Sequence, residues 1–173
     1  MSKILVVVDM QKDFIYGELG SPEAQAIVPA VVAKCKEAKK NYDTIIFTKD
    51  LHYPDDYTKS IESNYVPPHC MANENGHWII EELTPYLEHW ATKSTYAYQF
   101  WGDWHGIFNS ADEIEICGVC TDICVISNAL ALRGKYPDKP ITVDAKCCAG
   151  TSEERHFAAL KVMDSCSIQI INE

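Results

Sequence analysis

Four short apolar runs constrain the fold of this chain more than any other feature of its sequence. They are Lys3–Asp9, Thr44–Asp50, Glu113–Cys117 and Ile141–Asp144. Continuous runs of this length are typical of strands that are buried on both faces of a parallel sheet. Shorter segments at His89–Lys93 and Ser167–Ile171 bring the number of expected strands to six.

Segments with helical spacing separate these strands. The expected helices are Glu23–Lys39, a segment around Trp78–Leu87, Thr121–Arg133 and Ser152–Asp164. Alternation of strands and helices predicts an α/β fold, a three-layer α/β/α sandwich around a central six-stranded, mainly parallel sheet of the Rossmann-like kind. In such sheets ligands bind beyond the carboxyl ends of the strands, so residues at strand ends are the first candidates for function.

Length and composition indicate the class of protein. A chain of 173 residues with 47% hydrophobic and 23% charged residues fits one globular domain, residues 1–173. Its net charge of −10 argues against binding to nucleic acid or to anionic membranes. Since no apolar run reaches the length of a membrane span and no signal peptide is recognisable, we expect a cytoplasmic protein whose eight cysteines are reduced.

Three residues near strand ends supply a carboxylate, an ammonium and a thiol, namely Asp9, Lys93 and Cys124. Each alone fits a structural role, as a turn former, a surface charge or a small core residue. Together they would meet at one edge of the sheet, where a thiol needs a base and a cation to become a nucleophile. Thr121 or Asp122 is expected to cap the following helix and leave Cys124 in its first turn.

A second set of polar residues lies in and before a long irregular stretch from Asp50 to about His77. Its members are Asp50, His52, Glu62 and His69. Two imidazoles and two carboxylates suit a divalent transition metal such as zinc, manganese or iron. On residue types alone, scattered surface acids and histidines explain this pattern better than a metal site does, so the metal site stays a hypothesis at this point.

Two smaller features have structural alternatives. The aromatic side chains of Phe14, Tyr65 and Tyr96 could wall a pocket for a flat ring, although core packing explains each of them too. Cys117 and Cys120 form a C-x-x-C pair, but a structural zinc site needs a second pair at comparable spacing. The adjacent Cys147-Cys148 does not supply one, so we expect neither a zinc ribbon nor a thioredoxin-like site.

Five motifs carry a resemblance over nearly the whole chain. They are VVVDMQKDF at the first strand, TKDLH at the second, PPHC in the long loop, TKSTY at the third strand and GVCTDICV before the fourth helix. With these motifs the chain resembles the isochorismatase-like cysteine hydrolases, and more closely their nicotinamidase (pyrazinamidase) branch. The family fold is the one expected above.

The resemblance implies roles for the residues at matching positions. Asp9, Lys93 and Cys124 match the catalytic triad, and a cis peptide is expected at Val119–Cys120. The resemblance also implies an oxyanion hole of the backbone amides of Cys120 and Cys124, metal ligands and an aromatic pocket. The implied ligands are Asp50, His52 and His69 with Glu62 as the fourth, whereas Asp56 and Thr58 are weaker candidates and His77 and His89 are structural or exposed. Zinc is the expected metal, and a homo-oligomer is the expected assembly.

This sequence departs from the family pattern at three positions. Cys120 replaces a small residue, which leaves a disulfide with Cys124 open as a possibility under oxidation. Asn128 replaces a threonine, and we expect this change to affect helix packing more than chemistry. The family has an aromatic residue three positions before the histidine of the loop. Val66 takes that position here, and we expect Tyr65 to replace the aromatic ring in the pocket wall.

The resemblance implies an amidase that converts nicotinamide to nicotinate and ammonia through a cysteine thioester, in NAD salvage. Two alternatives remain within enzymes, a hydrolase of another small amide or carbamoyl compound and an isochorismatase. A different class is a non-catalytic redox or metal-binding protein that uses its eight cysteines. Release of ammonia from nicotinamide separates the amidase from this last class.

Overall fold

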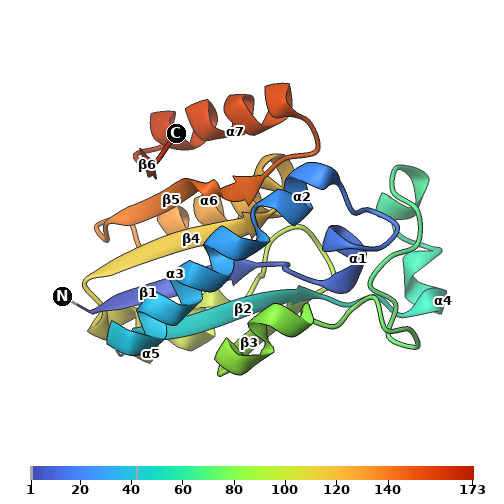
Figure 1. Cartoon of the computed structure of the whole chain (residues 1–173), viewed down its shortest axis with the longest axis horizontal. Coiled ribbons are helices and arrows are strands. Elements are labelled where there is room, and N and C mark those ends of the chain that lie inside the picture. Colours follow the sequence, from blue (N-terminus) through green and yellow to red (C-terminus); the bar gives the residue numbers. More distant parts are fainter. Residues whose placement is uncertain (1, 42) are drawn as a thin grey trace.

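A twisted, six-stranded parallel sheet forms the centre of the molecule in the computed structural model, which describes residues 2–41 and 43–173 (Figure 1). Its strands are β1 (Lys3–Val8), β2 (Thr44–Asp50), β3 (His89–Lys93), β4 (Glu113–Val119), β5 (Ile141–Ala149) and β6 (Gln169–Ile171). They lie in the order β3-β2-β1-β4-β5-β6, and every pair of neighbours is parallel. The predicted fold class is therefore confirmed.

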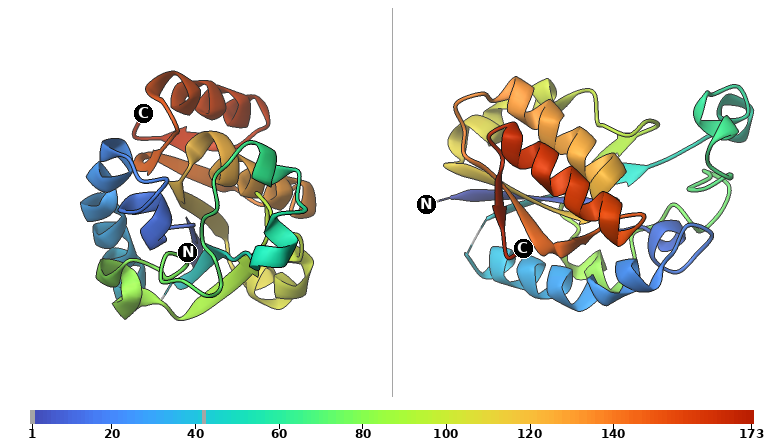
Figure 2. Two further views of the ribbon diagram at one scale, coloured as in Figure 1. Left: turned by 90° about the vertical axis from the view of Figure 1, so that its right-hand side faces the viewer. Right: turned by 90° about the horizontal axis from the view of Figure 1, so that it is seen from above.

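Helices cover both faces of this sheet (Figure 2). One face carries α2 (Pro22–Ala26), α3 (Val28–Asn41) and the 3₁₀ helix η2 (Glu81–Tyr86). The other face carries α5 (His105–Ser110), α6 (Ile126–Lys135) and α7 (Glu153–Ser165). No helix of residues 2–41 and 43–173 combines the length and the apolar character that crossing a membrane requires.

Shorter helices lie in the connections. They are α1 (Lys12–Ile15), α4 (Pro54–Tyr57), the 3₁₀ helices η1 (Glu62–Asn64) and η3 (Trp101–Trp104), and a π-helical turn η4 (Thr121–Val125). The loop with α4 and η1 stands out from the carboxyl end of the sheet (Figure 2). This loop is the long irregular stretch of the sequence.

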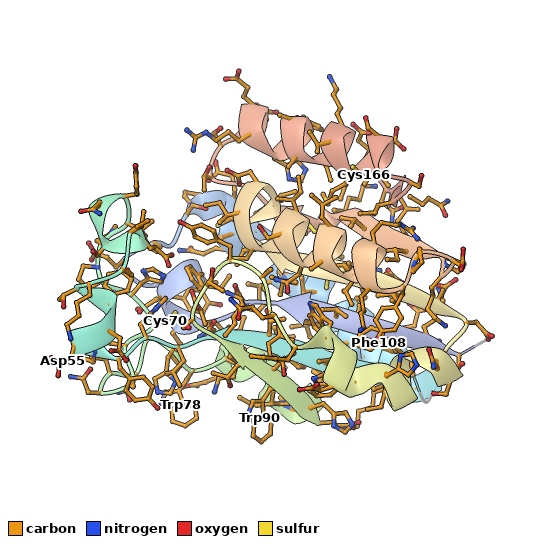
Figure 3. All side chains as sticks on the ribbon, turned by 180° about the vertical axis from the view of Figure 1, so that it is seen from behind. Asp55, Cys70, Trp78, Trp90, Phe108 and Cys166 are labelled. Atoms are coloured by element: carbon orange, nitrogen blue, oxygen red, sulfur yellow. The ribbon has the colours of Figure 1, made fainter. Side chains whose placement is uncertain are left out.

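The core follows from the apolar runs. Val6, Val7 and Val8 of β1 are fully buried, because β1 is a central strand with helices on both faces. Phe108 of α5 points between the helices and the sheet, whereas Trp90 on the edge strand β3 points away from the body (Figure 3). Apolar burial on both faces holds the carboxyl ends of the strands in fixed relative positions.

Two helix predictions need correction. The segment Glu23–Lys39 was expected as one helix, but it breaks at Ile27 into α2 and α3 because Pro29 provides no N–H for a continuing helix. Around Trp78–Leu87 only the 3₁₀ turn η2 forms, and it contains Pro85. Ser152 caps the start of α7, since its hydroxyl accepts a hydrogen bond from the Arg155 N–H.

The order of connections reverses beside β1. The chain moves outward from β1 through β2 to β3, and then returns to place β4 on the other side of β1. The carboxyl ends of β1 and β4 therefore border the crevice where open α/β sheets bind their ligands.

Gly118 of β4 lies directly against Val8 of β1, at a position where only glycine fits without strain. Its φ is +120°, and a Cβ built there would lie 2.1 Å from the Val8 carbonyl oxygen. We predict that Gly118→Ala lowers the free energy of unfolding by more than about 1 kcal/mol, because the new methyl meets backbone that has no room to shift. Urea unfolding measures this change.

Gly134 of α6 is the matched control, since a Cβ there meets nothing within 4 Å. Gly134→Ala should raise stability by up to about 1 kcal/mol through helix propensity. An unchanged urea midpoint in Gly118→Ala would contradict the claim that position 118 requires glycine.

Candidate active site and metal centre

A buried ammonium group lies at the centre of the polar cluster beyond the strand ends. Lys93, the last residue of β3, is only 5% exposed. Its Nζ lies 2.7 Å from Asp9 Oδ2, 3.6 Å from Asp50 Oδ1 and 3.7 Å from Cys124 Sγ. Burial acts to lower the pKa of Lys93, but Asp9, Cys124 and Asp50 together raise it above its ordinary value, so the side chain stays charged.

Asp9 directly follows β1 and is fully buried. Its φ of 50° turns the chain at the strand end, and its carboxylate accepts a 2.5 Å hydrogen bond from Thr48 Oγ1. The same hydroxyl accepts a bond from the Asp9 N–H. Burial raises the pKa of Asp9, against the opposing effect of Lys93, so this carboxylate is a stronger base than an exposed one.

Cys124 lies in the π-helical turn η4, which joins β4 to α6. Backbone N–H groups of Ile123 and Val125 donate to the Cys120 carbonyl, and the peptide Val119–Cys120 is cis, as expected. Cys120 takes the cap position without a side-chain cap. Burial raises the pKa of the Cys124 thiol well above its ordinary value, Lys93 opposes this shift, and the carboxylates of Asp9 and Asp50 raise the pKa further.

The predicted cap of this turn is wrong. Thr121 pairs its hydroxyl with His156 Nδ1 at 2.8 Å, and Asp122 accepts two hydrogen bonds from Thr151. Both side chains therefore connect η4 to residues near the start of α7. Neither of them caps the first N–H groups of η4. The thiol is protonated at rest, because its burial outweighs the nearby cation.

The four expected metal ligands come together next to this cluster. Asp50, His52, Glu62 and His69 each offer one ligand atom, and these atoms lie within 4.8 Å of one another. Asp50 Oδ2 is 3.2 Å from His52 Nε2 and 3.4 Å from His69 Nε2. Glu62 Oε1 is 3.8 Å from His69 Nε2.

The donor atoms fit a divalent metal ion. His69 Nδ1 lies 2.8 Å from the Pro67 carbonyl, so Nδ1 carries the proton and Nε2 presents its lone pair to the cluster. His52 Nε2 and Asp50 Oδ1 are buried and have no hydrogen-bond partner among the described residues. Buried polar atoms without partners are costly, and a shared cation would satisfy them. Two nitrogen and two oxygen ligands suit zinc, manganese or iron.

Local backbone bonds bring these ligands together. His52 N donates to the Cys70 carbonyl at 3.0 Å, and His52 and Met71 form an isolated bridge, which places the end of the PPHC motif beside β2. Burial acts to lower the pKa of His69, but hydrogen bonds to Asp50 and the Pro67 carbonyl raise it. Burial acts to raise the pKa of Asp50, but Lys93 and the two imidazoles hold it below its ordinary value.

Three supporting residues were not identified from the sequence. Thr48 bonds Asp9, as described. Gln11 makes two 2.7 Å bonds to the main chain of Asp50, one donated and one accepted. Tyr57 donates to the Val66 carbonyl at 2.7 Å, and its ring packs edge-on against the imidazoles of His52 and His69. Gln11 and Thr48 lie in the family motifs quoted above, and Tyr57 does not. The residues that Gln11 and Thr48 bind are distant in the sequence, so the sequence around them does not indicate these roles.

A cavity of about 790 Å³ opens onto both clusters. Its lining includes all three predicted pocket aromatics, Phe14, Tyr65 and Tyr96, together with Asp50, Glu62, His69, Cys120 and Cys124. Phe14 is buried and lies 5.4 Å from the His69 ring, measured between centroids. Tyr65 is 80% exposed and therefore lies at the mouth rather than against the floor.

The remaining candidates lie outside the two clusters. Asp56, Thr58 and His89 are exposed, and His77 is buried without belonging to the metal group. All eight cysteines are free, so Cys120 and Cys124 are not joined. The metal-ligand group found in the described part of the chain contains no cysteine.

This arrangement has the parts needed for covalent acyl chemistry. The Cys124 thiol and the Asp9 carboxylate both lie against the buried ammonium group of Lys93, and the thiol borders an open cavity. Transfer of the thiol proton to the carboxylate would create a nucleophile at the cavity floor.

The chain is similar in sequence and in structure to several known proteins. The chain is 29% identical over 193 residues to the nicotinamidase/pyrazinamidase of Mycobacterium tuberculosis, with 98% of each chain covered. The solved pyrazinamidase/nicotinamidase of Streptococcus mutans superposes with a TM-score of 0.86 at 29% identity, over 98% of this chain and 100% of that one. A pyrazinamidase of Pyrococcus horikoshii, solved in complex with zinc, has a TM-score of 0.82 at 25% identity, with both chains fully covered.

The isochorismatase domain model matches residues 3–172, which is nearly the whole chain. The match includes every strand of the sheet and both polar clusters. The chain therefore belongs to the isochorismatase domain family.

Proposed function

We propose that this protein hydrolyses nicotinamide to nicotinate and ammonia, and that it does so in NAD salvage. The observation that carries the proposal is the position of Lys93, whose ammonium touches Asp9 and Cys124 on one side and Asp50 of the metal group on the other. A nucleophile and a metal group thus share one cavity. The names of the similar proteins from Mycobacterium tuberculosis and Streptococcus mutans support this substrate.

The proposed reaction begins with the transfer of the Cys124 thiol proton to Asp9. Lys93 stabilises the thiolate and holds the carboxylate in place while sulfur attacks the carboxamide carbon. The backbone amides of Cys120 and Cys124 donate to the oxyanion that forms. Asp9 returns the proton to the leaving nitrogen, ammonia departs, and a thioester remains on Cys124. Water, deprotonated by Asp9, then hydrolyses this thioester to nicotinate.

Asp50, His52, Glu62 and His69 would hold the metal, with zinc as the proposed ion and manganese or iron as the other candidates. When bound, the ion supplies an open coordination position for the pyridine nitrogen, and this position fixes the ring. The zinc in the similar Pyrococcus horikoshii structure supports the assignment. Phe14 and Tyr96 would flank the ring, with Tyr65 at the mouth.

The remaining proposals concern the protein as a whole. We propose one functional domain over residues 1–173, a homo-oligomeric assembly and a cytoplasmic location. The match of the family model to residues 3–172 supports the single domain.

One observation favours a second candidate, a hydrolase of another, bulkier amide with the same nucleophile. The cavity of about 790 Å³ exceeds the volume of a single pyridine ring, and Tyr65 leaves its mouth open. Relative kcat/KM values for nicotinamide and for ring-substituted nicotinamides decide between the two. Preference for nicotinamide supports the first candidate.

Cys124 is the cysteine on which turnover should depend. We predict that Cys124→Ala lowers kcat by at least about a thousandfold, because no other group forms the thioester. Cys120→Ala should stay active, since only its backbone amide has a proposed role. Ammonia release from nicotinamide is the measurement, with circular dichroism to verify the fold. A dead Cys120→Ala beside an active Cys124→Ala would reverse the assignment.

The metal group should serve binding more than bond breaking. We predict that His52→Ala and His69→Ala lose bound metal and raise KM for nicotinamide by about tenfold or more, because the ring nitrogen loses its fixed partner. Benzamide lacks this nitrogen and should be a poor substrate. Plasma emission spectroscopy measures the metal, and initial rates give KM.

The exposed His89 supplies the control for these variants. His89→Ala should keep both its metal and its KM. Equal hydrolysis of nicotinamide and benzamide by the metal-loaded protein would exclude recognition of the ring nitrogen and favour a general small-amide hydrolase.

A further inference from the structure

Asn128 makes four hydrogen bonds in the interior of the protein. It lies on α6, four residues after Cys124, and its side chain is fully buried. Oδ1 accepts from the Tyr98 N–H at 2.9 Å and from the Trp101 indole Nε1 at 3.2 Å. Nδ2 donates to the Tyr96 carbonyl at 3.1 Å and to the Cys124 carbonyl at 2.8 Å. The amide thus uses both donors and both acceptor positions.

These bonds join two parts of the site that no regular structure connects. Residues 94–99 follow Lys93, contain no helix or strand, and bring Tyr96 to the cavity. Among residues 2–41 and 43–173, the Asn128 side chain makes the only hydrogen bonds found to the main chain of residues 94–99. Its fourth bond holds the turn that carries the nucleophile.

The chemistry of an amide is needed for this connection. A planar amide presents an acceptor on one side and two donors on the other, so it bridges N–H groups and carbonyls at the same time. The threonine that the family resemblance suggests at this position has one hydroxyl hydrogen to donate. A threonine would therefore reach the Cys124 carbonyl within the helix but would leave the 94–99 segment without its clamp. The hydrogen bonds of Asn128 to the 94–99 segment extend beyond the packing of its own helix, which is where we expected its main effect.

We infer that Asn128 is a positioning residue that fixes the Tyr96 wall of the cavity relative to the Cys124 sulfur. The expected effect on KM rests on the proposed function. The hydrogen bonds between Asn128 and residues 94–99 do not depend on which substrate binds. Asn128 touches neither substrate nor the reacting atoms and acts through Tyr96. Its loss should weaken the fit of the ring in the cavity and leave the Asp9, Lys93 and Cys124 contacts in place.

Asn128→Thr tests this inference in two independent measurements. Hydrogen exchange, followed by mass spectrometry, should be at least about tenfold faster in the peptide covering residues 94–101, because Tyr98 N–H loses its acceptor. In the kinetic measurement, KM for nicotinamide should rise about tenfold or more. Alkylation of Cys124 by iodoacetamide should stay within about twofold of the unmodified protein, since a small reagent does not need the wall.

A double variant separates positioning from general destabilisation. If Asn128 acts through Tyr96, adding Asn128→Thr to Tyr96→Ala should raise KM by less than about twofold further. Asn109→Thr on α5 is the matched control, because Asn109 is exposed and its amide bonds to the exposed His105 of the same helix. Asn128→Ala removes all four side-chain bonds, and it replaces Asn128→Thr in the same measurements if Asn128→Thr does not fold.

Each outcome decides a defined question. Unchanged exchange in residues 94–101 overturns the inference whatever the activity is. Unchanged KM in Asn128→Thr, or multiplicative effects in the double variant, also overturn it. If the unmodified protein releases no ammonia from nicotinamide, the proposed function fails, and the exchange and alkylation measurements still decide whether Asn128 clamps the segment.

Discussion

The buried charge of Lys93 is the interaction on which the rest of the site depends. An ammonium that is 5% exposed is stable only if opposite charges and hydrogen-bond acceptors replace its water. Asp9, Asp50 and Cys124 do so, and they come from the ends of β1, of β2 and from the turn after β4. A parallel sheet is the simplest structure that brings these ends and the end of β3 to one edge. The fold thus provides the geometry, and the charge of Lys93 couples the nucleophile to the metal group.

The sequence predicts the parts of this arrangement that follow from burial along a strand. The apolar runs identify β1 and β2 to within a residue, because central parallel strands are apolar on both faces. Once the strands are placed, their carboxyl ends must meet, and Asp9, Lys93 and Cys124 are expected together at that edge. The grouping of Glu62 and His69 came instead from the family resemblance, since loop residues have no periodic signal.

The parts that the sequence does not predict depend on hydrogen bonds between distant segments. Thr121 and Asp122 look like helix caps, but both bind residues near the start of α7. Likewise, Asn128 looks like an ordinary helix residue until the 94–99 segment is placed beside it. Such side chains choose among local and distant partners of similar strength, so only the tertiary structure decides which bond forms.

The most direct test of the role of Lys93 compares Asp9→Asn, Lys93→Met and the double variant in ammonia release and in urea unfolding. Lys93→Met leaves the buried Asp9 carboxylate without its cation, and Asp9→Asn leaves Lys93 with Asp50 as its only carboxylate partner among the described residues, whereas the double change removes both charges. We expect the double variant to be more stable than either single one, yet to lose no more than about tenfold beyond the worse of them in kcat/KM. Losses in kcat/KM that multiply, as for independent residues, would contradict a unit of Asp9, Lys93 and Cys124.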